Sequence, residues 1–152
     1  MLFVHVADVS KGVAATSARS QKVELLAELF RSADPDDVPL VIPYLAGRLP
    51  QGRIGVGWSA LKEPVTPAAE PTLAVRDVDA ALTALAGVSG AGAQSERRRL
   101  VEELMGAATA DEQRFLFGLL TGEVRQGALD ALAVEGLARA TGAAAAAGRR
   151  GG

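Results

Sequence analysis

The chain has 152 residues, a net charge of −2, 49% hydrophobic residues and only 4% aromatic residues. This length suits one domain or two small lobes sharing a core, and the low aromatic content favours helix-on-helix packing. No cysteine is present and His5 is the single histidine, which excludes disulfides and thiolate metal sites and argues against a zinc site. Without a basic signal region or an apolar run of about 20 residues, we expect a cytoplasmic protein that has no membrane partner.

The first third of the chain predicts three helices. Apolar residues at spacings of three and four indicate helices over residues 2–15 and 17–33. Asp34 and Pro35 are typical of a helix start, with Asp34 as the cap and Pro35 in the first helical position. The third helix is therefore expected to begin here and to end near Ala46.

Irregular segments are expected in the middle of the chain. Residues 47–57 hold four glycines and one proline, so they predict a loop, and residues 58–61 predict a short helix after it. Three prolines within residues 63–71 indicate a linker.

The second half of the chain predicts the same plan again. Helices are expected from about residue 77 and over residues 97–107, with a flexible connector at residues 89–93 between them. Thr109 and Glu112 match a capping box, which predicts the start of a further helix. The last helix is expected from about residue 128 to Ala140, followed by a frayed tail over residues 143–152.

These two halves are related in sequence by a constant offset of 75 residues without a gap. Leu45, Gly47, Gln51 and Gly52 recur at this offset, as do glycine, serine, leucine, glutamate and aspartate positions upstream of them. A fixed offset indicates that one structural unit was used twice. We therefore predict an all-α fold made of two pseudo-symmetric helical repeats, over about residues 2–61 and 77–137, in one domain of residues 1–142.

Each repeat ends in a glycine-bearing turn with arginine beside it, and these turns are the candidate binding sites. Free backbone amides next to a guanidinium make a phosphate-binding unit. No acidic residue lies between Asp37 and Glu63, so positive charge can be local although the chain is acidic. The alternative is that the glycines only close the C-termini of helices.

Catalytic constellations are missing from the sequence. A Ser/His/Asp triad needs a histidine, and the single histidine, His5, lies alone on the first predicted helix. No G-x-x-x-x-G-K-[ST] phosphate loop occurs either. Paired carboxylates such as Asp36-Asp37 and Asp111-Glu112 fall at predicted helix starts, where they stabilise the helix dipole.

Three segments resemble a known family: residues 14–17, 44–58 and 115–128. Two of them contain the runs Gln-Gly-Arg-Ile-Gly-Val-Gly-Trp and Gly-Glu-Val-Arg-Gln-Gly. Together these segments are similar to the N-terminal DNA-binding domain of bacterial ATP-dependent DNA ligases, of the actinobacterial type. The resemblance extends from Met1 to about Gly142.

The resemblance implies an all-α DNA-ligase-type domain that lies against the minor groove of nicked duplex DNA, in replication, repair and recombination. By position, the DNA-contacting residues would be those of the two turns: Arg48, Gly52, Arg53, Gly55, Arg125, Gln126 and Gly127. It also implies ATP and Mg²⁺ as cofactors of the full-length enzyme and a ligase catalytic domain as a further partner. We expect no catalytic residue, metal site or cofactor in this chain.

The adenylated lysine of these ligases lies in a Lys-x-Asp-Gly motif, which this chain lacks, because its only lysines are Lys11, Lys22 and Lys62. The chain is therefore expected to be inactive alone, as a fragment of a ligase or a truncated product that keeps the clamp. The competing hypothesis is a helical-repeat module that binds proteins, which predicts an exposed apolar groove and no salt-sensitive DNA binding.

Overall fold

The computed structural model describes residues 1–52, 54, 61, 64–122 and 129–150. Its described residues form seven helices and no strand beyond an isolated bridge between Leu2 and Ala74. The helices are α1 (Phe3–Ala15), α2 (Arg19–Ser32), α3 (Val38–Leu45), α4 (Val75–Ala86), α5 (Ala93–Ala107), α6 (Ala110–Thr121) and α7 (Leu129–Arg150). The all-α prediction is confirmed.

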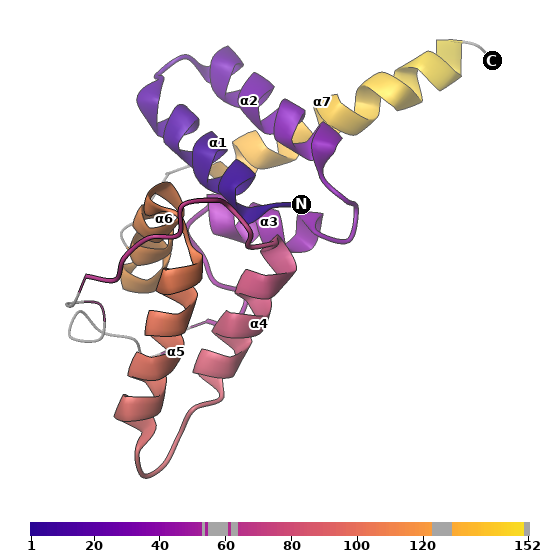
Figure 1. Ribbon diagram of the computed structural model, residues 1–152. Helices are drawn as coiled ribbons and strands as arrows, with labels where there is room; N and C mark the ends of the chain where they lie inside the picture. Colours follow the sequence, from indigo (N-terminus) through magenta and orange to yellow (C-terminus); the bar gives the residue numbers. More distant parts are fainter. Residues whose placement is uncertain (53, 55–60, 62–63, 123–128, 151–152) are drawn as a thin grey trace.

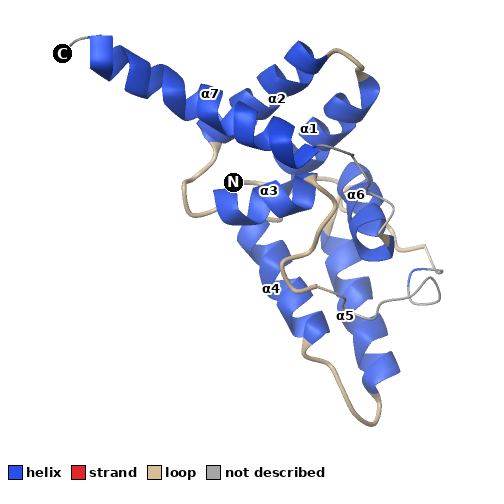
Figure 2. Cartoon of the chain, turned by 180° about the vertical axis from the view of Figure 1, so that it is seen from behind, coloured by secondary structure: helices blue, strands red, loops and turns tan. Residues whose placement is uncertain are grey.

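Equivalent helices occur at the predicted 75-residue offset. Shifted by 75, α2 covers residues 94–107 and α3 covers residues 113–120, which fall within or on α5 and α6. Contacts between the copies are reciprocal, since α1 packs against α6 while α4 packs against α3. Figure 1 shows α1, α2 and α7 grouped together, with α4, α5 and α6 below them, and Figure 2 shows α3 near the junction from behind.

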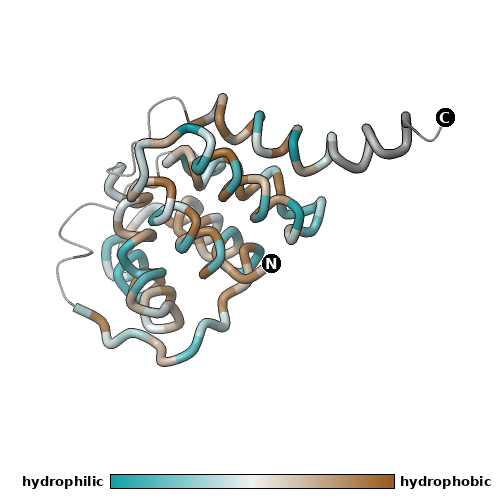
Figure 3. The backbone as a smooth tube through the Cα atoms, turned by 90° about the horizontal axis from the view of Figure 1, so that it is seen from above, coloured by the Kyte–Doolittle hydropathy of each residue, from teal (hydrophilic) through white to brown (hydrophobic). Residues whose placement is uncertain are grey.

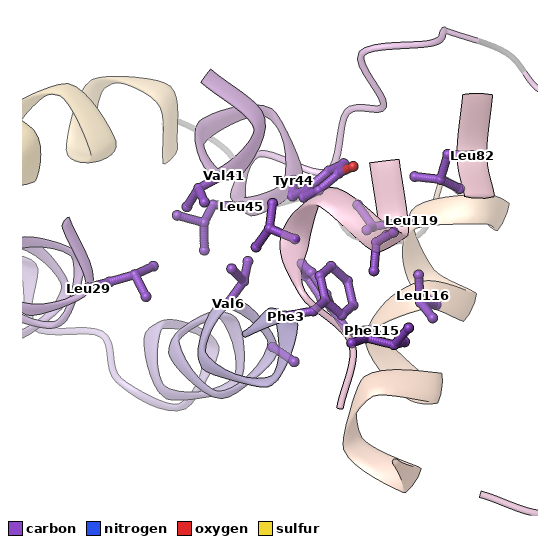
Figure 4. Close-up of a cluster of buried hydrophobic side chains, with 14 of the residues drawn as sticks. Phe3, Val6, Leu29, Val41, Tyr44, Leu45, Leu82, Phe115, Leu116 and Leu119 are labelled. Atoms are coloured by element: carbon purple, nitrogen blue, oxygen red, sulfur yellow. The ribbon is translucent and has the colours of Figure 1, made fainter. Parts of the chain in front are cut away.

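One continuous hydrophobic core joins the two copies. Phe3 lies at its centre, with its ring 5.9 Å from that of Tyr44 and 5.5 Å from that of Phe115. Figure 4 shows Val6, Val41 and Leu45 on one side of Phe3, and Leu116 and Leu119 on the other. Figure 3 shows hydrophobic and hydrophilic residues alternating along the helices, which is the pattern of helices with one buried face.

The predicted start of α3 is wrong. Asp34 does not cap a helix; its carbonyl accepts a hydrogen bond from the N–H of Asp37 at 2.9 Å, in a turn before α3 begins at Val38. The carboxylate of Asp37 is 2% exposed and accepts hydrogen bonds from the Met1 ammonium at 3.0 Å and from Arg76 Nε at 3.3 Å. Asp37, which local sequence places at the start of the helix, therefore forms ion pairs with residues that are distant in sequence.

Two other helix ends differ from their predicted positions. The helix predicted over residues 97–107 begins at Ala93, directly after Gly92 in the left-handed conformation with φ of 76°. At the other end of the chain, α7 continues to Arg150 instead of ending near Ala140. Residues 143–147 are all alanine, which has the highest helix propensity, and no proline interrupts residues 141–150, so the helix continues although Gly142 and Gly148 disfavour it.

The predicted capping box at the start of α6 is confirmed. The Thr109 N–H donates to Glu112 Oε1 at 2.8 Å, and the Glu112 N–H donates to Thr109 Oγ1 at 3.4 Å. Glu112 is fully buried, and the bond from Thr109 replaces part of the hydration that its carboxylate loses, while Oε2 has no hydrogen-bond partner among the described residues.

Replacing the capping hydroxyl should weaken the fold measurably. We expect Thr109→Ala to lower the free energy of unfolding by about 1 kcal/mol, because an orphan amide at the helix start loses its acceptor. Chemical denaturation followed by circular dichroism measures this. Thr141→Ala is the matched control, because Thr141 is exposed and its hydroxyl only donates to the Leu137 carbonyl in the same helix. A control that loses as much stability as Thr109→Ala would contradict the capping role.

Candidate nucleic-acid interface

The first predicted turn begins at the C-terminus of α3, where the chain forms a Schellman motif. The Gly47 N–H donates to the Tyr44 carbonyl at 3.0 Å and the Arg48 N–H donates to the Pro43 carbonyl at 2.8 Å. Gly47 has φ of 82°, which favours glycine because it has no Cβ. The glycine thus ends the helix sharply and turns the chain toward Arg48, whose side chain is exposed.

Gly52 closes the described part of this turn. Its φ is 73° and its N–H donates to the Leu49 carbonyl at 2.9 Å. A side chain at this position would meet no atom within 4 Å, so the left-handed conformation, not crowding, accounts for glycine here. Leu49 packs against the core and Ile54 is 7% exposed, which anchors the turn from both sides of Gly52.

These hydrogen bonds correct one part of the sequence-based interpretation. The backbone amides of the first turn were expected to point outward as free donors, yet those of Gly47, Arg48 and Gly52 all donate to carbonyls of the chain itself. Gly47 therefore closes the helix end, as in the alternative interpretation, while Gly52 closes a separate turn after it. A ligand at these three residues would meet the Arg48 side chain before any free amide.

Gln51 holds the turn against α4 of the second copy. Its Nε2 donates to Asp79 Oδ1 at 2.7 Å and lies 3.1 Å from Thr83 Oγ1. The sequence singled out Gln51 only as part of the repeated Gln-Gly pair, and assigned DNA contact to Gln126 of the second pair. The structure gives Gln51 a positioning role, which fixes the first turn relative to a helix 28 residues away in sequence.

Tyr44 lies beneath the same turn. Its side chain is fully buried, and within the described part of the structure its hydroxyl has no hydrogen-bond partner. Burial, together with the negative charge of Asp79, raises the pKa of Tyr44 well above its usual value. The phenol therefore stays neutral and serves as a packing residue, and it cannot act as a base near neutral pH.

The second predicted turn begins, like the first, with a glycine in the left-handed conformation. Gly122, at the 75-residue offset from Gly47, has φ of 75°, and its N–H donates to the Gly118 carbonyl at the end of α6. Five of the predicted contact residues lie outside the described residues, namely Arg53, Gly55, Arg125, Gln126 and Gly127. Their grouping with Arg48 and Gly52 stays a prediction.

Much of the positive charge on the described surface is matched by nearby carboxylates. Arg99 pairs with Glu96 and Glu103, Arg114 pairs with Asp111 at 2.8 Å, and Arg76 pairs with Asp37 at 3.3 Å. Further pairs join α2 to α7: Arg19 with Glu135, and Arg139 with Glu24. Because these arginines are paired, unbalanced positive charge on the described surface is confined to the basic residues that have no carboxylate nearby.

Two classes of site are not found among the residues that the structure describes. They contain no group of three or more histidine, cysteine, aspartate or glutamate residues placed to hold a metal ion. Over the same residues, no helix has both the length and the apolar character needed to cross a bilayer.

Comparison with known proteins shows which family the chain resembles. A family model described as "DNA ligase N terminus" matches residues 59–138, which is more than half of the chain. This match includes the segment between the two copies, α4, α5 and α6, the second turn and the first part of α7.

Curated relatives match nearly the whole chain. A "Probable DNA ligase" of Streptomyces avermitilis is 71% identical over 143 residues, which is 94% of this chain and 28% of the relative. A protein of the same name in Streptomyces griseus is 68% identical with the same coverage. The one in Rhodococcus jostii is 44% identical over 92% of this chain and 28% of the relative. The chain thus spans a little over a quarter of the length of these relatives.

Proposed function

Because the chain belongs to the family of DNA ligase N-terminal domains, we propose that it binds duplex DNA independently of sequence, as the minor-groove clamp of an ATP-dependent DNA ligase acting at nicks. Such a role would serve DNA replication, repair and recombination. The observation that carries the proposal is the repetition of one bend: Gly47 and Gly122 both end a helix in the left-handed conformation, 75 residues apart. Two similar bends suit duplex DNA, because its sugar–phosphate backbones offer the same chemical group at repeated positions.

Arginine side chains are the proposed contacts to the sugar–phosphate backbone. Arg48 and Arg53 follow the first bend and Arg125 follows the second. Guanidinium groups bind phosphate through paired hydrogen bonds, and contacts of this kind carry no base information. Since the amides of Gly47, Arg48 and Gly52 are already bonded within the chain, binding at the first bend depends on side chains.

The residues of this chain do not fit the ATP and Mg²⁺ that the family implies. The sequence contains no Lys-x-Asp-Gly motif, and its described residues contain no cluster of potential metal ligands. We therefore assign no nucleotidyl-transfer step to it and propose binding alone.

Salt dependence and two arginine substitutions test the clamp. We expect the affinity for a labelled nicked duplex, measured by fluorescence anisotropy, to fall with salt at a log–log slope near −3 if three phosphates are neutralised. Replacing Arg53 and Arg125 by alanine removes two of these contacts, so the slope should become shallower by about 2 and the affinity at low salt should fall at least roughly tenfold. An intact duplex measured alongside tests the preference for nicks.

A charge-matched variant provides the control. Replacing Arg99 and Arg114 by alanine removes the same total charge from exposed positions that already pair with carboxylates. This variant should retain the parent slope and affinity. If the Arg53 and Arg125 double variant binds the nicked duplex as tightly as the parent, the clamp is refuted. Equal losses in both double variants would show that only net charge matters.

A further inference from the structure

The side-chain amide of Gln51 is held by three acceptors on α4. Its Nε2 donates to Asp79 Oδ1 at 2.7 Å and lies 3.1 Å from Thr83 Oγ1 and 3.4 Å from the Asp79 carbonyl oxygen. Gln51 stands between Arg48 and Gly52, in the turn that the Gly52 N–H closes. These bonds therefore attach the middle of the first turn to a helix of the second copy.

Apolar contacts hold this turn near its two ends. Leu49 packs against the hydrophobic core and Ile54 is 7% exposed, whereas Gly52 between them is exposed. Arg48, one position before Leu49, is exposed as well. The contact of Gln51 with α4 is therefore a polar link that sets where the exposed part of the turn lies.

The two ends of the Gln51 amide are satisfied unequally. Its Oε1 is buried and has no hydrogen-bond partner in the described part of the chain, so the bonds of the amide are those of Nε2. Burial of an amide is unfavourable unless it is hydrogen-bonded, and the bonds of Nε2 offset this cost. Without the Asp79 acceptor, we expect the Gln51 side chain to turn toward water and to release the turn from α4.

The negative charge of Asp79 would, by itself, disfavour a phosphate ligand at this turn. Asp79 is half-buried, and among the described residues no basic side chain forms an ion pair with it. A carboxylate close to bound DNA repels the phosphates. On charge alone, removing Asp79 should raise the affinity for DNA, whereas loss of its bond to Gln51 should lower the affinity. The sign of the change therefore distinguishes the two effects.

We propose that Asp79 and Thr83 are positioning residues for DNA binding. They hold Gln51, and through it they fix the turn from which Arg48 reaches the sugar–phosphate backbone. Neither belongs to the seven residues that we assign to DNA contact, and neither contacts DNA in this arrangement. The inference rests on the proposed function, to which it adds a requirement: the first bend binds well only while it is held on α4.

Two substitutions of Asp79 test the proposal in the whole chain, by fluorescence anisotropy with a labelled nicked duplex. Asp79→Leu removes both the charge and the acceptor, and it should lower the affinity at low salt about fivefold, because the bond to Gln51 is lost. The log–log salt slope should become shallower by up to about 1, since the phosphate contact of Arg48 is weakened. Asp79→Asn keeps an oxygen acceptor without the charge, so it should bind at least as tightly as the parent.

Thr83 allows a test without any change of charge. Thr83→Val removes one acceptor of the Gln51 amide, and it should lower the affinity for the nicked duplex about twofold. Thr141→Val is the matched control, because Thr141 is exposed and its hydroxyl donates to the Leu137 carbonyl in its own helix. This control should bind as the parent does. Thermal unfolding followed by circular dichroism establishes that the variants fold.

Hydrogen exchange tests the position of the turn without DNA. The Gly52 N–H donates to the Leu49 carbonyl at 2.9 Å, and its exchange reports whether the turn stays closed. Exchange of this amide should be about fivefold faster in Asp79→Leu than in the parent, because the turn is no longer held on α4. In Asp79→Asn it should match the parent.

The outcomes separate this inference from the proposed function. A parent chain that binds no duplex refutes both. If the parent binds, an Asp79→Leu variant that binds as tightly or more tightly shows that Asp79 acts through its charge alone, which refutes only the inference. Equal losses in Asp79→Leu and Asp79→Asn, or in Thr83→Val and Thr141→Val, would show that the acceptors do not matter. Unchanged exchange of the Gly52 amide in Asp79→Leu would mean that α4 does not hold the turn.

Discussion

Gly136→Val should lower the free energy of unfolding by about 3 kcal/mol, the largest effect that we expect from a substitution in α7. A Cβ at this position would lie 2.7 Å from the Leu26 Cβ, 3.3 Å from the Ala27 N and 3.4 Å from the Leu26 carbonyl carbon. Two of these atoms belong to the backbone of α2, so no side-chain rotation relieves the clash. The measurement is urea denaturation followed by circular dichroism.

Gly142→Ala is the matched control in the same helix. A Cβ at Gly142 would meet no atom within 4 Å, so only the helix propensity changes. Alanine is favoured over glycine in a helix by about 1 kcal/mol, and this control should therefore be neutral or stabilising. If Gly136→Val is as stable as the parent, α7 does not pack against α2 as described.

Asp37→Asn should lower the free energy of unfolding at pH 7 by about 3 kcal/mol, because it removes the anion from a buried ion-pair cluster. Burial of Asp37 alone would raise the pKa of its carboxyl, but hydrogen bonds from the Met1 ammonium and Arg76 outweigh burial and hold that pKa below its usual value. The two cations would then lose their buried partner. Asp36→Asn is the control, since the Asp36 side chain is 88% exposed, and its effect should stay within about 0.5 kcal/mol.

The difference in unfolding free energy between the parent and Asp37→Asn should depend on pH, because the pKa of Asp37 is lowered in the folded state. A carboxyl with a depressed folded-state pKa contributes its full stability above the unfolded-state value of about 3.9. That contribution is lost as the pH falls toward the folded-state pKa. The gap between parent and Asp37→Asn should thus be constant near neutrality and shrink below about pH 4. A gap that is independent of pH down to pH 2 would contradict the ion-pair account.

Local signals in the sequence predict many of the helices. The apolar spacing places α1 and α2 correctly, and Thr109 with Glu112 predicts the start of α6, because capping depends on residues that are neighbours in the chain. The start of α3 could not be predicted in this way. Asp34 and Pro35 satisfy every local rule for a helix start, yet Asp37 is held by Met1 and Arg76, which are distant in sequence.

The positions of the glycine-bearing turns could be predicted from the sequence, but the hydrogen bonds of their amides could not. Glycine and duplication identified the turns, and Gly47, Gly52 and Gly122 all adopt the left-handed conformation. The direction of their amides could not be read from residue types, because closing a helix and binding an anion use the same donors. The contact of Gln51 with Asp79 was likewise hidden, since it depends on how the first turn meets α4 of the other copy.

Elements of each copy pack against the other copy, and we expect this packing to limit motion of one copy relative to the other. α7 of the second copy lies on α2 of the first, while Gln51 and residues 64–68 of the first copy are bonded to α4, α5 and α6. Neither half retains a complete packing surface when separated from the other. The distance between the bends at Gly47 and Gly122 therefore depends on the packing of both copies together. Under the proposed function, a duplex would have to match that distance to contact both bends.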